Sequence, residues 1–297
     1  MEKYGLTVRQ IRLNKGFKQK EIYTGLLSKS FSIDFEKGLY DIKFSIMLNI
    51  LKRLMISIDE FILIHNHYHE NVINQTLVEI NEKKFENDNH YAKLITDMIH
   101  KESKKSQDPA SRVKYWQMLI LQSIYSDIDF QNSKDYLQAK QEIQNYLFNI
   151  ETWTLSELRI FSNMHFLFED NEIKTSLFLT AWKSIEKYQY HPEFLTYITH
   201  LLTNYLFSLI YTQQYSLAAK VIERLYELTE EMTMMVWKVM LYYLEGLYFY
   251  ATDKQEKGLQ LIHKAKLICD LTDNKNIIEQ IKVGFKIIQN NKEKKRY

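Results

Sequence analysis

Apolar residues recur every three or four positions along most of the chain, which is the spacing that predicts amphipathic helices. Glycine and proline strengthen this prediction. Four of the seven glycines fall within the first 38 residues, the next is Gly246, and the prolines are Pro109 and Pro192. A span of roughly 200 residues with so few breakers favours helices joined by short polar loops over sheets and turns. The pattern therefore predicts an all-α fold.

The first 66 residues predict several short helices rather than a few long ones. Leu6, Ile11 and Leu13 recur with helical spacing, and this first helix should end at the segment Asn14-Lys15-Gly16. The segment "FKQKEIYTGLL" predicts a second helix. The segment "IKFSIMLNILKRLMISIDEFI" predicts two more, the last beginning after a capping serine, Ser57.

A third helix is predicted between these, from about Lys29 to Lys37 in "LLSKSFSIDFEKG". Phe31 and Phe35 lie one turn apart and should pack inward, and Gly38 should end the helix. Five short helices with a tight link between the second and the third are typical of a helix-turn-helix domain.

The remaining chain shows a weak repeat. The segment "EGLYFYATDKQEKGLQLIHKAKL" places Gly246, Phe249, Gly258, Ile262 and Ala265 at the packing positions of a tetratricopeptide-like helix pair. Stacked helix pairs form a curved array whose concave face suits an extended peptide. We therefore predict a helix-turn-helix domain over residues 1–66 and a tetratricopeptide-like helical repeat domain over residues 67–297.

Charge and cysteine content narrow the class of protein. Residues 1–66 carry a net charge of +4 and the remainder −2, which fits polyanion binding confined to the first domain. The single Cys269 suits a reducing compartment. No apolar run approaches about 18 residues, and the segment "MEKYGLTVRQIR" lacks the apolar core of a signal peptide. We expect a cytoplasmic protein that does not cross a membrane.

The first domain resembles a known family over residues 3–65. The residues that carry this resemblance are Gln19, Ser30-Phe31, Phe35-Glu36-Lys37-Gly38, Asp41-Ile42 and Ile58-Asp59-Glu60-Phe61. They are similar to the N-terminal domain of Rgg/MutR-type transcription regulators, in which a helix-turn-helix domain is followed by a helical repeat that binds short signalling peptides. The resemblance implies that the second helix lies over phosphates and that the third enters the major groove.

Basic, amide and hydroxyl side chains around these two helices could contact DNA. Plain solvent exposure is the alternative for each lysine. Glu36 is expected to pair with a nearby arginine, Arg9 or Arg12, rather than to read a base. The predicted DNA contacts are Arg12, Lys18, Gln19, Lys20, Ser28, Lys29, Ser30, Ser32, Asp34 and Lys37.

The third helix departs from its relatives at Ile33-Asp34, where they commonly carry Ser-Arg or Ser-Lys. Loss of a basic residue removes a contact worth about 1–3 kcal/mol, whereas an aspartate can accept from a cytosine amino group. We expect the DNA sequence that is read to differ from that of relatives. A first domain that no longer binds DNA is the alternative.

Polar side chains at helical spacing in the second domain could line a peptide groove. Arginine can hold a carboxylate, and asparagine can pair with a peptide backbone. Packing within the core is the alternative for each, and it is the favoured interpretation for Trp153, Trp237 and Tyr243. The predicted peptide contacts are Arg159, Asn163, Tyr197, His200, Asn204 and Tyr243.

Catalytic and metal-binding motifs do not emerge from the sequence. His65, His67 and His69 in "HNHYH" could include a metal pair, but a polar linker is favoured. No phosphate-binding loop, HExxH or GxSxG segment occurs, so we expect neither an enzyme nor a cofactor.

The sequence thus predicts a transcription regulator that binds double-stranded operator DNA as a homodimer and responds to a short signalling peptide. The alternative is a helical-repeat scaffold that binds a protein partner and uses its first domain only to dimerise.

Overall fold

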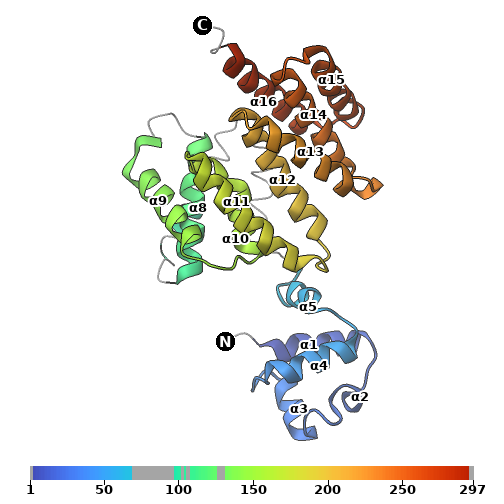
Figure 1. The fold of residues 1–297 in the computed structure, drawn as a ribbon. Helices are drawn as coiled ribbons and strands as arrows, with labels where there is room; N and C mark the ends of the chain where they lie inside the picture. Colours follow the sequence, from blue (N-terminus) through green and yellow to red (C-terminus); the bar gives the residue numbers. More distant parts are fainter. Residues whose placement is uncertain (1–2, 69–96, 102–103, 105–107, 126–130, 294–297) are drawn as a thin grey trace. The chain divides into compact units, whose positions relative to one another are not determined.

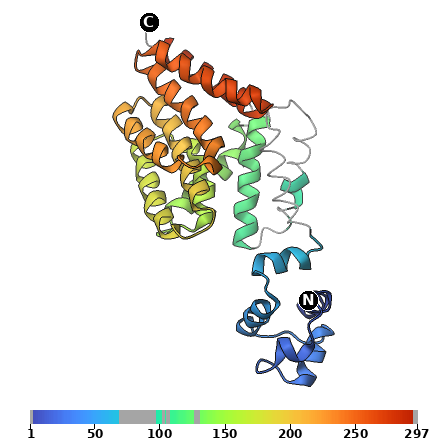
Figure 2. The same cartoon turned by 90° about the vertical axis from the view of Figure 1, so that its right-hand side faces the viewer.

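A computed structural model describes residues 3–68, 97–101, 104, 108–125 and 131–293. The chain divides into two compact units, Met1–Asn81 and Glu82–Tyr297, which we call the head and the body. Every regular element in the described ranges is a helix (Figures 1 and 2), which confirms the all-α prediction. No helix in these ranges has both the length and the apolar content to cross a membrane. The predicted domain boundary between residues 66 and 67 stays a prediction.

The head holds the five short helices that the hydrophobic pattern predicts (Figure 1). Their ends follow local chemistry: the Ser57 hydroxyl accepts from the Glu60 amide, and Gly38 takes a φ of 71° directly after the third helix. Residues from all five helices surround one apolar core. The helices are α1 (Tyr4–Asn14), α2 (Gln19–Tyr23), α3 (Lys29–Glu36), α4 (Phe44–Leu54) and α5 (Ile58–His65).

A buried ion pair joins α1 to α3. Arg12 Nε lies 2.6 Å from Glu36 Oε1 and Arg12 Nη2 lies 2.8 Å from Glu36 Oε2, so the contact is bidentate. Only 7% of Arg12 and 2% of Glu36 is exposed. From α2, the Tyr23 hydroxyl and the Gln19 amide also donate to this carboxylate, at 2.7 and 2.8 Å. One carboxylate therefore ties three helices together.

This network sets the ionisation of its members. Burial alone would raise the pKa of Glu36, but the hydrogen bonds from Arg12, Tyr23 and Gln19 outweigh it and lower the pKa. Burial and the hydrogen bond to Glu36 together raise the pKa of Tyr23. Glu36 is therefore charged and Tyr23 neutral at pH 7. The pairing of Glu36 with Arg12 was one of the two that the sequence predicted.

Several head residues lie differently from the prediction. Arg12 was predicted to contact phosphate, but its guanidinium is buried on Glu36 and also donates to the Phe17 carbonyl at 2.8 Å. Ser32 was predicted to face outward, but it is 2% exposed and its hydroxyl donates to the Lys29 carbonyl. Leu6 and Leu13 were predicted on the apolar side of α1, yet about half of each is exposed.

The two phenylalanines of α3 also behave differently. Phe35 is fully buried. Phe31 is half-buried and stacks on the exposed ring of Tyr40, with centroids 5.7 Å apart. Gly5 explains how closely α1 approaches α3, because a Cβ at that position would lie 1.7 Å from the Phe35 carbonyl oxygen.

The body is a succession of helices in which most chain neighbours pack against each other (Figures 1 and 2). From α10 onward, every second helix also contacts the one after next: α10 contacts α12, α12 contacts α14, and α14 contacts α16. This is the packing expected of a stack of helix pairs. The helices are α8 (Pro109–Tyr125), α9 (Lys134–Phe148), α10 (Leu155–Met164), α11 (Asn171–Ile185), α12 (Phe194–Tyr211), α13 (Tyr215–Leu228), α14 (Met235–Ala251), α15 (Gln255–Leu271) and α16 (Lys275–Glu293).

The glycines of the weak repeat lie at the closest approach of α14 and α15. A Cβ on Gly246 would lie 2.8 Å from the Gly258 carbonyl oxygen, and a Cβ on Gly258 would lie 2.6 Å from the Gly246 carbonyl oxygen. Ala265 on α15 is fully buried. The predicted helix pair is therefore present, and small residues permit its tight packing.

Tyr243 belongs to the core between α14 and α16, not to a groove. It is 3% exposed, and its hydroxyl lies where a Cβ on Gly284 would be. This hydroxyl has no hydrogen-bond partner among the residues that the structure describes. This burial agrees with the favoured interpretation of Tyr243 as a core residue, and it places Tyr243 outside the candidate peptide surface.

We predict that Arg12→Ala destabilises the head by about 3–5 kcal/mol, because removal of one partner leaves the Glu36 charge buried and uncompensated. Hydrogen–deuterium exchange of α1, α2 and α3 in the full chain measures this loss. Arg9→Ala is the matched control, because Arg9 is exposed on the same helix and its loss should change stability by less than about 0.5 kcal/mol. Equal protection in the two variants would contradict the role given to Arg12.

We predict that Tyr243→Phe raises the free energy of unfolding of the body by about 1 kcal/mol, because it removes a buried hydroxyl that lacks a partner. Urea unfolding of the full chain, followed by tryptophan fluorescence, tests this. Tyr226→Phe is the control with the opposite sign, since the Tyr226 hydroxyl donates to Glu245. A destabilised Tyr243→Phe variant would show that this hydroxyl has a partner.

Candidate functional site

The link between α2 and α3 fixes where α3 begins. The Lys18 backbone amide donates to the Glu21 carboxylate at 2.6 Å and so caps α2. Gly25 has a φ of 78°, which turns the chain after α2 at a position that suits glycine. The Ser28 hydroxyl then accepts from the Phe31 amide and caps α3. Arg53 of α4 donates to the carbonyls of Ile22 and Thr24, both at 2.8 Å, and holds this turn.

One side of α3 faces away from the head core. Its buried residues are Ser32, Phe35 and Glu36. The residues on the opposite side follow the i, i+1, i+4, i+5, i+8 spacing of a single helix face. We call this set the α3 outer face: Lys29, Ser30, Ile33, Asp34 and Lys37. Asp34 and Lys37 form an ion pair with 3.8 Å between Oδ1 and Nζ, and 37% and 56% of their side chains are exposed.

The predicted DNA contacts differ in how far they are exposed on the head. Exposed residues occur at the start of α2 and the start of α3, namely Lys18, Lys20 and Ser28. Gln19 is half-buried, and its amide nitrogen donates to Glu36, so the side chain is held at the first turn of α2. Arg12 and Ser32 are buried and fall outside the candidate surface.

Ile33 was not predicted as a contact, yet it lies on the α3 outer face. It sits one turn after Lys29 and one turn before Lys37. The spacing of four residues from both lysines could have identified Ile33 as part of this face from the sequence.

A second polar group of side chains forms where α10 packs against α12. Arg159 on α10 donates to the Tyr197 hydroxyl on α12, and its guanidinium lies 5.5 Å from the centre of that ring. A capping box formed by Thr154 and Glu157 begins α10, and it sets the register of Arg159. The structure thus brings together two residues that lie 38 positions apart in the sequence.

The next turn of α12 continues this polar group. The Asn204 amide donates to the Ser162 carbonyl of α10 at 2.8 Å and lies 3.2 Å from His200 Nε2. The His200 ring lies 5.7 Å from the ring of Trp237 on α14. Asn163 on α10 is exposed. We call the set formed by Arg159, Asn163, Tyr197, His200 and Asn204 the α10–α12 polar seam.

The seam extends further than the sequence predicted. Ser208 lies one turn beyond Asn204, and its hydroxyl lies 3.5 Å from Lys174 Nζ on α11. Burial lowers the pKa of Lys174. His165, directly after the end of α10, contacts the Ser162 carbonyl, and burial lowers its pKa to about 4, so the ring is neutral at pH 7. The recurrence of His200, Asn204 and Ser208 every four residues was the signal for this extension.

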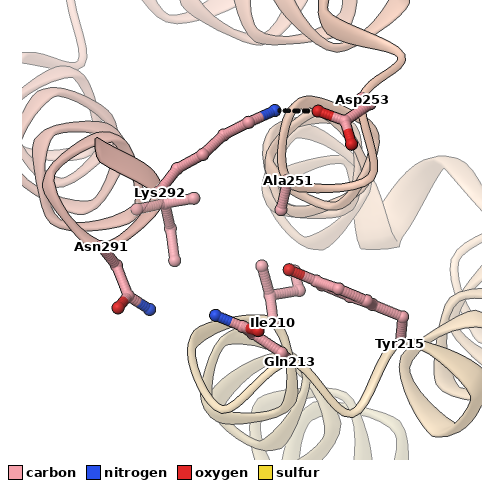
Figure 3. A pocket seen from close by; sticks show the side chains of 8 residues that line it. Ile210, Gln213, Tyr215, Ala251, Asp253, Asn291 and Lys292 are labelled. Atoms are coloured by element: carbon pink, nitrogen blue, oxygen red, sulfur yellow. Dashed lines mark hydrogen bonds and ion pairs between the residues drawn. The ribbon is translucent and has the colours of Figure 1, made fainter. Parts of the chain in front are cut away.

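A pocket lies where α12, α14 and α16 end (Figure 3). Its polar side chains form hydrogen bonds and an ion pair near the ends of helices. Asn291 donates to the Tyr211 carbonyl at 2.9 Å, while Lys292 donates to the Tyr250 carbonyl at 2.8 Å and to Asp253 at 2.7 Å. The pocket is therefore a structural junction that fastens α16 to the ends of α12 and α14.

The histidines of "HNHYH" show no metal site in the part of the chain that is described. His65 Nδ1 lies 2.8 Å from the Thr7 hydroxyl, and its ring packs against Tyr4 and Phe61. His69 lies outside the described residues. No cluster of three or more metal-binding side chains occurs within the described ranges.

Comparison with known proteins connects these features to a family. The family model described as "HTH-type transcriptional regulator Rgg, C-terminal domain" matches residues 93–283, which is more than half of the chain. A putative transcriptional regulator from Listeria monocytogenes EGD-e is similar in structure, with a TM-score of 0.78 and 28% sequence identity. That alignment covers 99% of both chains.

Two further solved structures share the fold. The Streptococcus dysgalactiae SHP pheromone receptor Rgg2 aligns with a TM-score of 0.69 and 22% identity, over 95% of this chain and 98% of that one. PrgX in its complex with cCF10 aligns with a TM-score of 0.61 and 17% identity, over 98% of this chain and 94% of that one.

The match over the body confirms the resemblance that the head suggested. It also places the protein in a family of transcription regulators. The chain belongs to the Rgg family of helix-turn-helix transcriptional regulators.

Proposed function

We propose that the protein regulates transcription in the cytoplasm by binding double-stranded operator DNA as a homodimer, with α2 over the phosphates and the α3 outer face in the major groove. The observation that supports this most strongly is the α3 outer face itself. Five side chains project away from the core on a helix that the Arg12–Glu36 pair holds in place. Two heads are needed because one short helix contacts too few base pairs for high affinity.

Within this proposal, the exposed lysines of the head neutralise phosphates. Lys18, Lys20 and Lys29 lie at the starts of α2 and α3, where backbone amides also favour negative charge. Ser28 and Ser30 are short enough for contacts to phosphates or base edges. Asp34 accepts from a cytosine amino group, while Lys37 limits its repulsion from phosphates.

We propose further that a short peptide controls the protein through the α10–α12 polar seam. Rgg2 is an SHP pheromone receptor, and another similar solved structure is that of a bacterial peptide pheromone/receptor complex. The seam offers an exposed arginine for a carboxylate and amide or imidazole groups for a peptide backbone. Peptide binding would favour one of two arrangements of the protein, and DNA and peptide would then affect each other's affinity equally.

Selection of duplexes from a random pool tests DNA binding. We predict that the protein enriches a duplex whose binding weakens steeply as salt rises. Asp34→Arg should strengthen binding to unselected duplex by at least about fivefold and should change the selected sequence. Asp59→Arg makes the same charge change on α5, away from the α3 outer face, and should not change the selected sequence.

If no duplex is enriched at any salt concentration, the protein is not a DNA reader. The scaffold alternative would then be favoured. A changed preference in Asp59→Arg as well as Asp34→Arg would mean that α3 is not the reading helix.

A library of short synthetic peptides tests the proposed control by a peptide. We predict that some members change the affinity for the selected duplex, and that Arg159→Ala weakens this effect by about tenfold through loss of a carboxylate contact. Arg224→Ala is the matched control, because Arg224 is an exposed arginine of α13 paired with Glu227. If Arg159→Ala and Arg224→Ala respond equally to every active peptide, the seam is not the peptide site.

A further inference from the structure

Ile33 is an apolar side chain on the polar outer face of α3. It is half-buried, although neither of the residues that flank it on this face, Lys29 and Lys37, is apolar. Other half-buried apolar residues of the described head, such as Leu26, Leu27 and Ile42, pack against the head core, and Ile33 does not. Within the described head, packing against the core therefore does not explain why an isoleucine stands here.

The position of Ile33 is fixed by its surroundings. Phe35 and Glu36 of α3 are buried, and Glu36 accepts hydrogen bonds from both α1 and α2. A β-branched side chain in a helix has one strongly preferred χ1 rotamer. Ile33 is consequently a rigid apolar group that is presented in one direction, in contrast with the flexible lysines one turn away on either side.

Few base edges can make a favourable contact with such an apolar group. Isoleucine can neither donate nor accept a hydrogen bond. The hydrogen-bonding groups of guanine, adenine and cytosine would lose water against it without gaining a partner, which is costly. Thymine is the base whose edge in the major groove presents a methyl group.

We propose that Ile33 reads a thymine in the operator through contact with the thymine 5-methyl group. This inference rests on the proposed DNA binding and names part of the sequence that is read. Lys29 and Lys37 would hold the backbone on either side, and Asp34 would read a neighbouring base through its acceptor oxygens. Specificity at this position would therefore depend on apolar contact rather than on hydrogen bonds.

Replacement of thymine by 2′-deoxyuridine tests the proposal, because it removes the 5-methyl group and leaves base pairing intact. The probe is the duplex that the wild-type protein selects from a random pool, with its thymines replaced one at a time. At one position in each half-site, we expect the wild-type protein to bind the deoxyuridine duplex about fourfold more weakly. For Ile33→Ala, the thymine and deoxyuridine duplexes should bind equally at that position.

Two further variants separate methyl recognition from general loss of affinity. Ile33→Val keeps a β-branched apolar side chain and should keep the preference for thymine. Lys29→Ala should weaken binding to both duplexes while preserving the ratio between them, since it removes a phosphate contact. Because Ile33 lies outside the head core, amide exchange of the head should be unchanged in Ile33→Ala.

Three results would overturn the proposal in distinguishable ways. If no duplex is selected, the proposed function fails and the inference fails with it. If a duplex is selected but no deoxyuridine replacement weakens it, DNA binding stands and methyl recognition is wrong. If Ile33→Ala retains the same preference for thymine as the wild-type protein, another residue reads the methyl group.

Discussion

The head depends on the buried carboxylate of Glu36. The helices it joins are short, with five residues in α2 and eight in α3, and helices of this length are not stable in isolation. Arg12 supplies the opposite charge from α1, while Tyr23 and Gln19 supply hydrogen bonds from α2. Without these donors the charge would be buried and uncompensated, which costs about 3–5 kcal/mol. The orientation of α3 follows from this one set of contacts.

The same network shows why part of the head was predictable and part was not. Helix existence, the Ser57 cap and the stop at Gly38 depend on neighbouring residues, and they emerge from the sequence directly. The side on which Arg12 and Ser32 lie depends on contacts with residues far along the chain. Arginine and serine occur on surfaces and in buried networks alike, so composition and spacing do not decide between the two.

In the body as well, contacts between residues that are distant in the sequence could not be predicted. Helical spacing identified polar residues on α10 and α12, but their meeting across 38 to 42 positions of sequence needed the fold. Tyr243 shows the opposite case, because an aromatic residue with a polar end suits both a groove and a core. Its burial against Gly284 depends on how closely α16 packs on α14. The glycine at position 284 gives no indication in the sequence that it lies opposite Tyr243.

In α3, stability and recognition use separate residues. Ser32, Phe35 and Glu36 hold the helix, whereas Lys29, Ser30, Ile33, Asp34 and Lys37 project away from it. Substitution on the outer face therefore leaves the network that orients the helix intact. This separation accounts for the unusual pair Ile33-Asp34, which departs from the common pattern of the family without disturbing its fold. In the proposed complex with DNA, an apolar group and an acceptor in place of a hydroxyl and a cation would change which bases fit the same helix, because methyl contact and acceptance from amino groups would replace donation to guanine.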